Sequence, residues 1–441
     1  MKKIAILGAG ESGVGAAILG KVKGMEVLVS DSGKISESRK QELRESGIEY
    51  EEGGHSEERI CGSDLVVKSP GIPEDAPLVV ELRSKGIPVI SEIEFAGYYS
   101  KAKMIGITGA NGKTTTTLLT HHLLTSAGVS ASLAGNIGKS LARQVANGDE
   151  SEWYVIELSS FQLDGMEKFR CDVGVLCNIT PDHMDRYDHD FSKYARSKMR
   201  ITQNMRAEDT FVYNIDDEGT MAHLVETPAR KVAVSTKGKS QEAHSEDGRV
   251  EVRVRGEYRS EVEELPIKGI HNVYNSMMAI AVAQVVGLSE KQIKEGLKTF
   301  KNAPHRLEHV RTLDGVEYVN DSKATNVDAA WYALECQKRP VIWIVGGKDK
   351  GNDYGAIYDI AKSKVRSIVC LGKDNKKIID YFGSRGMEVH DTHSIEECVM
   401  KCREVAQSGD VVLLSPCCAS FDLFTSYENR GDLFRKVVES L

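Results

Sequence analysis

The chain has 441 residues, which at about 150 residues per domain predicts about three domains, each large enough for its own hydrophobic core. Hydrophobic residues make up 41% and charged residues 28% of the chain, a composition that excludes disorder as the main state. The formal net charge of -8 excludes a generally basic surface. We therefore expect no nucleic-acid binding, and anionic ligands would need local cationic sites.

Cysteine usage and hydropathy suggest a cytoplasmic protein. The 9 cysteines are scattered and contain no Cys-x-x-Cys pair, which favours a reducing compartment over a disulfide framework or a zinc site. The apolar run at residues 4–7 is too short for the core of a signal peptide, and no run is long enough for a membrane span. We expect no membrane insertion.

Short apolar runs alternate with amphipathic segments along most of the chain. Strands that alternate with helices predict parallel sheets covered on both faces, hence an α/β fold. Residues 232–265 are polar with alternating valines, which predicts a small antiparallel sheet attached to the middle domain. We expect domains at 1–93, 94–300 and 301–441. The predicted strands are residues 4–7, 27–29, 65–67, 104–107, 155–158, 173–176, 341–345, 368–371 and 411–414.

A glycine-rich turn follows the first predicted strand and opens a helix. Gly8, Gly10 and Gly13 form the pattern that lets backbone approach a diphosphate at a helix N-terminus, and Asp31 ends the next strand, where an acid can reach a ribose. The alternative is a tight strand-to-helix turn without a ligand. Ser69, with Pro70 and Gly71, suggests another loop on the same sheet edge.

A phosphate-binding loop is predicted at residues 109–115, directly after a strand and before a helix. Its backbone amides would surround phosphates, Lys113 would neutralise the β and γ oxygens, and Thr114 would offer its hydroxyl to magnesium. Ile107 stands where the usual pattern has a glycine, so the loop is a shortened variant. Its residues are Gly109, Ala110, Asn111, Gly112, Lys113, Thr114 and Thr115.

Three further residues are candidates by position. Glu157 ends a strand, where a phosphate-loop protein needs a carboxylate for its metal. His183 follows a buried strand and could contact a metal or a phosphate, although a loop histidine is more often without such a role. Lys198 lies on a basic helix face that is typical of a solvated surface.

Together these motifs resemble the Mur ligases, the ATP-dependent amino-acid ligases of peptidoglycan precursor synthesis. Within the family, segments 157–163 and 414–422 resemble the members that add D-glutamate, and the Asp-Asn-Pro-Arg motif of the members that add diaminopimelate or lysine is absent. The resemblance covers essentially the whole chain through residues 109–115, 135–138, 182–183, 197–198, 269–272, 304–308 and 321–326.

The resemblance implies roles for residues that spacing cannot assign. Lys198 would be carbamylated, Thr114 and Glu157 would hold one magnesium ion, and His183 with carbamylated Lys198 would hold a second. Lys323 would lie near the ATP phosphates and the acyl group. ATP would also contact Asn272, Arg306 and Asp321. UDP-N-acetylmuramoyl-L-alanine would contact Gly8, Glu11, Ser12, Gly13, Asp31, Ser32, Ser69, Pro70, Gly71 and Asn136.

For the incoming D-glutamate, the resemblance points to Thr325, Lys350, Ser420, Phe421 and Tyr427. The chemistry agrees, because two carboxylates require a cation and hydroxyl or amide donors. Lys348 lies two residues before Lys350, and the sequence leaves open which of the two is the contact.

The implied reaction is ATP-dependent amide formation by a monomer. The L-alanine carboxylate would attack the γ-phosphate of ATP, and the D-glutamate amine would then displace phosphate from the acyl phosphate. Folylpolyglutamate synthetase is a related alternative, but it lacks the N-terminal glycine turn and usually has Gly-Lys-Gly in the loop. A nicotinamide-dependent oxidoreductase would leave the phosphate loop unexplained. A nucleotide-gated binding protein would need none of Lys198, Lys323 or Lys350.

Overall fold

The computed structural model describes residues 2–149, 151–238, 240, 242–302 and 304–441. Within these residues the strands form three sheets, and the expected α/β class is confirmed. Contacts divide the chain into two compact units, one made of Met1–Pro266 with Tyr274–Phe300 and the other of Ile267–Val273 with Lys301–Leu441. The three-domain boundaries drawn from the sequence stay predictions.

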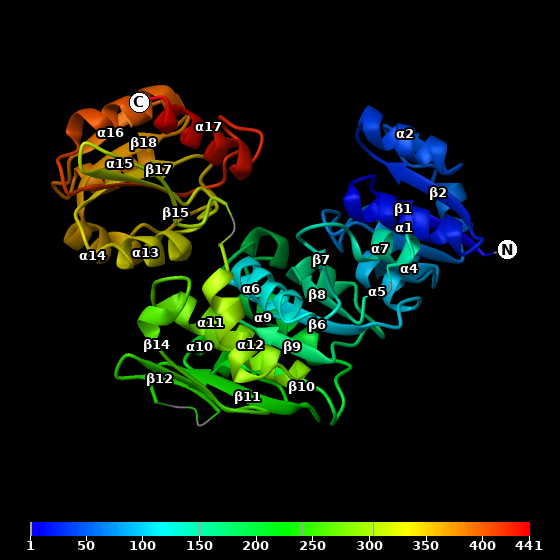
Figure 1. Cartoon of the computed structure of the whole chain (residues 1–441). Helices are drawn as coiled ribbons and strands as arrows, with labels where there is room; N and C mark the ends of the chain where they lie inside the picture. The colour runs from blue at the N-terminus through cyan, green and yellow to red at the C-terminus, as the bar shows by residue number, and fades with distance from the viewer. Residues whose placement is uncertain (1, 150, 239, 241, 303) are drawn as a thin grey trace. The chain divides into compact units, whose positions relative to one another are not determined.

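The first sheet is parallel, with strand order β3-β2-β1-β4-β5 (Figure 1). Its inner strands are apolar and were expected. β3 is polar and lies at the edge of the sheet, where its side chains are not buried and no run of apolar residues marks the strand. The strands are β1 (Lys3–Leu7), β2 (Glu26–Asp31), β3 (Glu49–Glu52), β4 (Leu65–Lys68) and β5 (Val89–Ser91), and the helices are α1 (Glu11–Val22), α2 (Glu37–Glu45), α3 (Glu57–Cys61), α4 (Pro77–Ser84) and α5 (Glu92–Gly97).

The second sheet has the order β14-β13-β12-β11-β10-β9-β6-β8-β7. The strands from β12 to β7 are parallel, so β6, β7, β8 and β9 end at one edge. The strands are β6 (Lys103–Thr108), β7 (Ala131–Gly135), β8 (Trp153–Glu157), β9 (Val173–Leu176), β10 (Thr210–Asn214), β11 (Arg230–Ser235), β12 (Ala243–Glu246), β13 (Arg249–Val252) and β14 (Tyr258–Glu261).

The antiparallel strands predicted in 232–265 are present, but they extend the parallel sheet instead of forming a sheet of their own. β12, β13 and β14 pair antiparallel, and β12 joins β11 in parallel at two positions. The helices of this part are α6 (Lys113–Ser126), α7 (Leu141–Ala146), α8 (Ser160–Asp164), α9 (Phe191–Met199), α10 (Glu218–His223), α11 (Ile270–Val286) and α12 (Glu290–Thr299), with 3-10 turns η1 (Met184–Tyr187), η2 (Arg200–Thr202) and η3 (Val262–Glu264).

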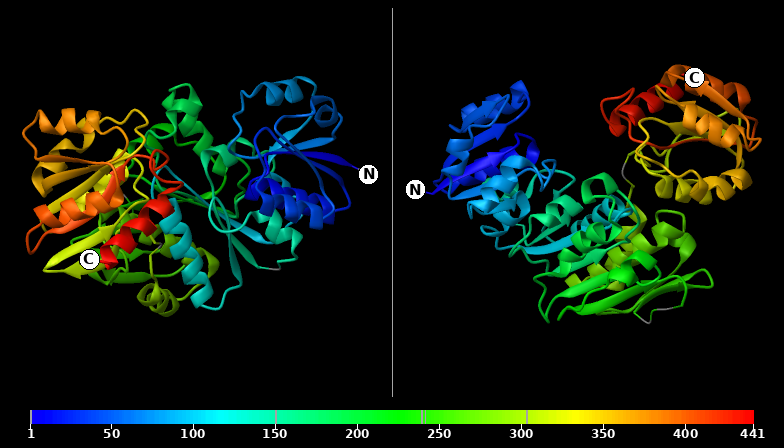
Figure 2. Two further views of the ribbon diagram at one scale, coloured as in Figure 1. Left: turned by 90° about the horizontal axis from the view of Figure 1, so that it is seen from above. Right: turned by 180° about the vertical axis from the view of Figure 1, so that it is seen from behind.

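The third sheet, order β15-β16-β20-β17-β18-β19, has helices on both faces, as Figures 1 and 2 show. One buried cluster joins it to α13, α14 and α15, and another joins its opposite face to α16 and α17. The strands are β15 (Glu308–Leu313), β16 (Val316–Asn320), β17 (Val341–Gly346), β18 (Val365–Leu371), β19 (Val389–Thr392) and β20 (Val411–Cys417), and the helices are α13 (Val327–Glu335), α14 (Gly355–Lys364), α15 (Lys376–Gly383), α16 (Ile395–Val405) and α17 (Tyr427–Glu439).

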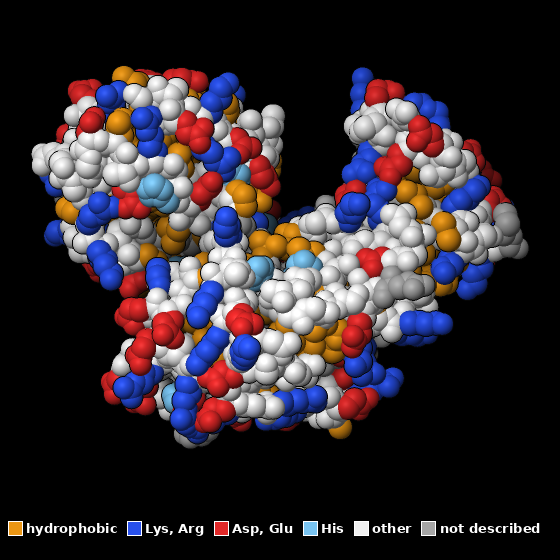
Figure 3. Space-filling model, in the orientation of Figure 1, with side chains coloured by type: hydrophobic (Ala, Val, Ile, Leu, Met, Phe, Trp, Pro, Cys, Tyr) orange, Lys and Arg blue, Asp and Glu red, His pale blue; other side chains and the backbone are white. Residues whose placement is uncertain are grey.

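Surface charge is mixed, as the composition predicts. On the face shown in Figure 3, basic and acidic side chains are interspersed without a large patch of one sign. Within the part of the chain that the structure describes, no helix is long and apolar enough to cross a membrane.

The first two sheets of the first unit share one apolar core, and a buried acid lies among the helices between them. Glu92, the first residue of α5, is 2% exposed, and its Oε1 accepts a hydrogen bond from the Ala142 N–H at the start of α7. Its Oε2 is buried and has no hydrogen-bond partner among the described residues. Burial raises the pKa of Glu92 from 4.5 to about 7.

We expect Glu92→Gln to change how stability depends on pH. The folded chain keeps a proton on Glu92 that the unfolded chain releases, so the stability from this group is present below pH 4.5 and is lost as pH rises through about 7. Glutamine keeps the acceptor for Ala142 but does not titrate. In thermal unfolding, the Tm of the variant relative to that of the wild type should rise between about pH 5 and pH 8.

The exposed Glu45→Gln, on α2, is the matched control and should show no such gain. If the difference in Tm between Glu92→Gln and the wild type is the same at about pH 5 and about pH 8, the assignment of the buried proton is contradicted.

Candidate active site

The predicted phosphate loop joins β6 to α6 at the carboxyl edge of the second sheet. β6 ends at Thr108 and α6 begins at Lys113. Gly112 has φ +84°, and a Cβ there would lie 2.5 Å from Asn275 Oδ1, so the position requires glycine. The first amides of any α-helix lack helical partners, so the start of α6 offers donors to an anion.

Asn178, just beyond β9, holds the loop from the neighbouring strand. Its Oδ1 accepts from the Asn111 N–H at 2.9 Å, its backbone oxygen accepts from the Ala110 N–H at 3.0 Å, and its Nδ2 donates to the Asn111 oxygen at 3.2 Å. These amides are engaged within the protein, so phosphate binding would fall to the amides at the start of α6. Asn178 was not among the predicted site residues. Its position could have indicated a role, because it is a polar residue just beyond the end of a strand beside β6.

Two lysines converge on one loop carbonyl. Lys113 Nζ donates to the oxygens of Gly109 and Ala110, both at 2.7 Å, and Lys198 Nζ donates to the Gly109 oxygen at 2.8 Å. Lys198 is 2% exposed, and its Nζ lies 4.7 Å from the centre of the Tyr194 ring. Burial, followed by the charge of Lys113, lowers the pKa of Lys198 well below its ordinary value.

The prediction from the residue pattern that Lys198 lies on a solvated helix face is therefore wrong, because this lysine lies on a buried face of α9. An ammonium ion beside a second cation and away from water is unfavourable, so the site favours an uncharged or an anionic side chain here.

Glu157 lies at the end of β8, level with Ile107 of β6 and Gly135 of β7. The side chain is 2% exposed, and Oε1 accepts from Asn136 Nδ2 at 2.8 Å. Oε2 is buried and has no hydrogen-bond partner among the described residues. A buried carboxylate oxygen without a protein donor suits a divalent cation.

Thr114 lies buried in the first turn of α6, the position from which the phosphate-loop pattern offers a hydroxyl to the same ion. No group of three or more His, Cys, Asp or Glu side chains that could hold a metal occurs in the described ranges. Magnesium fits this donor set because it keeps several waters and binds phosphate oxygens besides one or two protein ligands.

His183 lies directly before η1, has φ +53° and is about half exposed. Its ring contacts Phe161 edge-on, with the ring centres 5.2 Å apart, and its Nε2 lies 3.6 Å from Asp182 Oδ2. The negative charge of Asp182 acts to raise the pKa of Lys198, against the larger effect of burial. The role of His183 as a metal ligand stays a prediction.

The N-terminal glycine turn is tight. A Cβ on Gly13 would lie 1.9 Å from the Gly8 oxygen, and Ser69 Oγ donates to that oxygen at 3.4 Å. Asp31 accepts from the Ala9 N–H at 2.7 Å and from the Gly33 N–H at 2.8 Å, so it fixes the turn itself. The other predicted contacts, at the carboxyl edge of the same sheet, are Ser12, Ser32, Pro70 and Gly71.

Glu11, at the start of α1, is held by arginines. It forms ion pairs with Arg39 at 2.6 Å and Arg143 at 2.7 Å. Burial acts in the opposite direction, but hydrogen bonds from Arg143, from the Ser140 N–H and from Arg39 lower the pKa of Glu11. A direct contact between Glu11 and a UDP-sugar stays a prediction.

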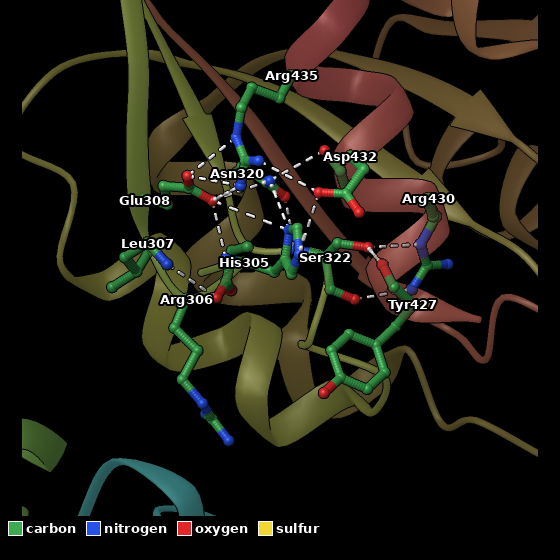
Figure 4. A network of polar contacts seen from close by, with 12 residues as sticks. His305, Arg306, Leu307, Glu308, Asn320, Ser322, Tyr427, Arg430, Asp432 and Arg435 are labelled. Carbon is green, nitrogen blue, oxygen red and sulfur yellow. Dashed lines mark hydrogen bonds and ion pairs between the residues drawn. The ribbon is translucent and has the colours of Figure 1, made fainter. Parts of the chain in front are cut away.

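In the second unit, Asp321 follows β16 and is 7% exposed. It accepts hydrogen bonds from the Leu307 N–H at 3.2 Å and from Ser415 Oγ at 3.0 Å. Burial raises the pKa of Asp321 to about 7, although the Ser415 hydrogen bond and the charge of Arg306 act to lower it. Figure 4 shows the Arg306 side chain pointing away from the surrounding network.

Arg430, on α17, ties two loops of the second unit together (Figure 4). It is 1% exposed, and it donates to Ser322 Oγ at 2.9 Å, to the Ser322 oxygen at 2.8 Å and to the Cys418 oxygen at 3.2 Å. Lys323 follows Ser322, and its Nζ lies 5.1 Å from the centre of the Tyr427 ring. No local pattern predicts the role of Arg430, because a helical arginine normally indicates a solvated face.

The residues predicted for D-glutamate come together in part. Lys348 pairs with Ala419 through two backbone hydrogen bonds, of 2.8 and 3.2 Å, which brings the loop at 346–350 beside Ser420 and Phe421. Ser420 is buried, whereas Phe421 is 70% exposed. Lys348 and Lys350 are both exposed, and the choice between them stays open. Thr325 lies after Lys323, in the loop before α13.

The predicted ATP contacts are divided between the units. The phosphate loop lies in the first unit, and Asn272, Arg306, Asp321 and Lys323 lie in the second. Asn272 is buried, and its Nδ2 donates to the Lys268 oxygen at 2.8 Å. Their joint action on one nucleotide stays a prediction.

Comparison with known proteins gives end-to-end matches. Residues 107–283 match the family "Mur ligase middle domain", residues 305–418 match "Mur ligase, glutamate ligase domain" and residues 3–78 match "MurD N-terminal domain". UDP-N-acetylmuramoylalanine--D-glutamate ligases from Bacteroides fragilis and Cytophaga hutchinsonii are 49% and 50% identical to this chain over all of it and over 100% and 99% of their own lengths. This chain belongs to the Mur ligase family.

Solved Mur ligases share the fold at lower identity. UDP-N-acetylmuramate-alanine ligase MurC from Thermotoga maritima aligns over 100% of both chains with 20% identity and a TM-score of 0.61. A pseudomurein peptide ligase type C from Methanothermus fervidus aligns over 100% of both chains with 21% identity and a TM-score of 0.62. The resemblance to Mur ligases found in the sequence is thereby confirmed.

For this Mur ligase we expect Glu157→Gln to weaken magnesium-dependent nucleotide binding. The amide removes the charge of a carboxylate whose Oε2 has no hydrogen-bond donor among the described residues, so affinity for ATP in magnesium should fall by at least about tenfold, while affinity without magnesium stays similar. Calorimetric titration with a non-hydrolysable ATP analogue measures both. Glu152→Gln, at an exposed residue directly before β8, is the control. Equal affinity of Glu157→Gln and wild type in magnesium would contradict the assignment.

Proposed function

We propose that this chain is the ATP-dependent ligase that adds D-glutamate to UDP-N-acetylmuramoyl-L-alanine in peptidoglycan precursor synthesis, releasing ADP and phosphate. The supporting observation is the end-to-end match, at 49% and 50% sequence identity, to relatives that carry the name of that ligase. The phosphate loop with its two lysines agrees with the use of ATP, but alone it would fit many nucleotide enzymes.

The three domains would take separate substrates. Residues 1–93 would bind the UDP-sugar, residues 94–300 ATP, and residues 301–441 D-glutamate. The L-alanine carboxylate attacks the γ-phosphorus of ATP, the bond from that phosphorus to the bridging oxygen breaks, and ADP leaves. The D-glutamate amine then attacks the acyl carbon, loses a proton, and displaces phosphate through a tetrahedral intermediate.

Cations of the chain offset the repulsion between these anionic reactants. Lys113, at the start of α6, would bind the β- and γ-phosphate oxygens, releasing its hydrogen bonds to Gly109 and Ala110. Lys323 would face the transferred phosphoryl group, and Arg306 with Asp321 and Asn272 would orient the nucleotide. Lys350 or Lys348, with Thr325, Ser420, Phe421 and Tyr427, would hold D-glutamate.

Two magnesium ions would complete the site. Thr114 and Glu157 would hold one, and His183 with carbamylated Lys198 would hold the other. Bound magnesium supplies charge neutralisation and alignment of phosphate oxygens. Unmodified Lys198 is a cation or a neutral amine, so the second position fits a metal only once this side chain is anionic.

The surroundings of Lys198 support the proposal that it is carbamylated. A neutral amine attacks the carbon of CO₂, a nitrogen–carbon bond forms, and the nitrogen loses a proton to solvent, which leaves a carbamate anion. Burial at 2% exposure beside Lys113 favours the neutral amine that this step needs. The product replaces repulsion between two cations by attraction between Lys113 and an anion. We further propose that the enzyme acts in the cytoplasm as a monomer.

Phosphate release is the direct test of the substrate assignment. Purified chain with ATP, magnesium and UDP-N-acetylmuramoyl-L-alanine should release phosphate with D-glutamate and at least about a hundredfold more slowly with L-glutamate or L-lysine, because the acceptor site must match both carboxylates. Turnover with another amino acid but not with D-glutamate would reject the assignment.

The carbamate makes a second prediction. Lys198→Ala should lose nearly all turnover and regain part of it in acetate or formate, because a small carboxylate can occupy the place of the missing anion. Chloride at the same ionic strength is the control. Full activity of Lys198→Ala would remove the carbamate from the mechanism.

A further inference from the structure

We propose that Arg143 is a positioning residue that couples the UDP-sugar site to the nucleotide site, by holding Glu11 at one end of the segment 135–143 while Asn136 holds Glu157 at the other. The inference rests on the proposed function, since it assumes that a UDP-sugar diphosphate binds at the start of α1.

Arg143 belongs to a cluster of four charges. Arg143 Nε donates to Glu11 Oε1 at 2.7 Å, and its Nη1 donates to Glu42 of α2. Arg39 of α2 joins the same two carboxylates, at 2.6 Å to Glu11 and 2.9 Å to Glu42. The Arg143 side chain is 11% exposed, and the two positive and two negative charges cancel. A partly buried network of this kind fixes geometry better than an isolated surface pair.

The helices α1 and α7 approach each other closely at Gly15. A Cβ on Gly15 of α1 would lie 1.9 Å from Ser140 Oγ and 3.1 Å from the Arg143 nitrogen. Ser140 caps α7 by accepting from the Arg143 N–H at 3.1 Å, and its own N–H donates to Glu11 at 3.2 Å. The start of α7 is therefore fixed against the start of α1, where the glycine turn ends.

The other end of the segment is fixed to Glu157. Asn136 donates through its N–H to the Glu157 oxygen at 2.9 Å and through Nδ2 to Oε1 at 2.8 Å. Gly135 has φ +93°, and a Cβ there would lie 2.2 Å from the Glu157 oxygen. Both Asn136 and Arg143 thus lie on one short piece of chain, with hydrogen bonds to the two candidate sites at its ends.

The charge of Glu11 makes the UDP-sugar site sensitive to Arg143. A carboxylate in the first turn of α1 would repel a diphosphate bound at the glycine turn, and Arg143 with Arg39 cancels that charge. Loss of Arg143 leaves part of the Glu11 charge uncompensated and removes the ion pairs that join α7 to α1 and α2. The first effect falls on the UDP-sugar, and the second on alignment for phosphoryl transfer.

Steady-state kinetics on the full chain separates this role from a general structural one. Arg143→Gln should raise the KM for UDP-N-acetylmuramoyl-L-alanine by at least about tenfold and lower kcat, with the KM for D-glutamate changed less than about twofold. Adding Glu11→Gln should restore part of the UDP-sugar KM, because the repelling charge is then absent. Glu42→Gln removes the other carboxylate partner of Arg143 and should leave that KM within about twofold of wild type.

If Arg143→Gln raises the KM of all substrates equally, the proposal is overturned. It is also overturned if the change in UDP-sugar binding free energy in the double variant of Arg143→Gln and Glu11→Gln is the sum of the two single changes. Arg143→Lys keeps the charge and serves if Arg143→Gln fails to fold; its UDP-sugar KM should rise less but in the same selective way. If wild type does not turn over the proposed substrates, calorimetric binding of UDP to the same variants still decides: weaker binding with Arg143→Gln and not with Glu42→Gln supports the role of Arg143, and equal binding rejects it.

Discussion

The carbonyl oxygen of Gly109 accepts hydrogen bonds from two lysines, Lys113 and Lys198, and the chemistry of the first unit depends on that contact. Lys113 is the first residue of α6, whereas Lys198 is buried on α9. Two ammonium ions at this spacing repel each other, and burial adds a desolvation cost for Lys198. In the proposed mechanism a bound triphosphate would draw Lys113 outward, and carbamylation would remove the positive charge of Lys198, so both steps would relieve the same repulsion.

Parallel strands explain why the relevant residues lie at one edge. β6, β7 and β8 end beside one another, with Ile107 and Gly135 both level with Glu157, so residues far apart in the chain meet where the strands stop. The third sheet repeats this arrangement: the loops after β17 and β20 pair through Lys348 and Ala419. Ligands in open α/β sheets bind at this kind of edge, and the substitution of loops there changes function without changing the core.

Local pattern predicted much of the architecture and part of the site. Apolar runs predicted most of the inner strands, though not β10 or β16, and glycines between a strand and a helix predicted the turn at Gly8 and the loop at Gly109, because both signals lie within a few residues. The polar edge strand β3 and the three-residue strand β5 were not predicted, because short strands show little periodicity in the sequence. The buried position of Lys198 could not be read locally, because its helix is amphipathic and the covering residues come from distant segments.

The contacts that hold the site are nearly all long-range. Asn178 holds a loop 67 residues earlier, Arg143 reaches Glu11 across 132 residues, and Arg430 reaches Ser322 across 108. No pattern in a single sequence relates such pairs, because each becomes defined only when strands are ordered and helices packed. The residues that bear chemistry were therefore easier to predict than the residues that position them.

The central claim is that Lys198 functions as a carbamate, and ¹³C NMR of the protein equilibrated with ¹³C-labelled bicarbonate tests it most directly. The account predicts a carbamate carbon resonance in the wild type that disappears in Lys198→Ala and persists in a control variant of an exposed lysine such as Lys291→Ala. Identical spectra for the wild type and Lys198→Ala would contradict it.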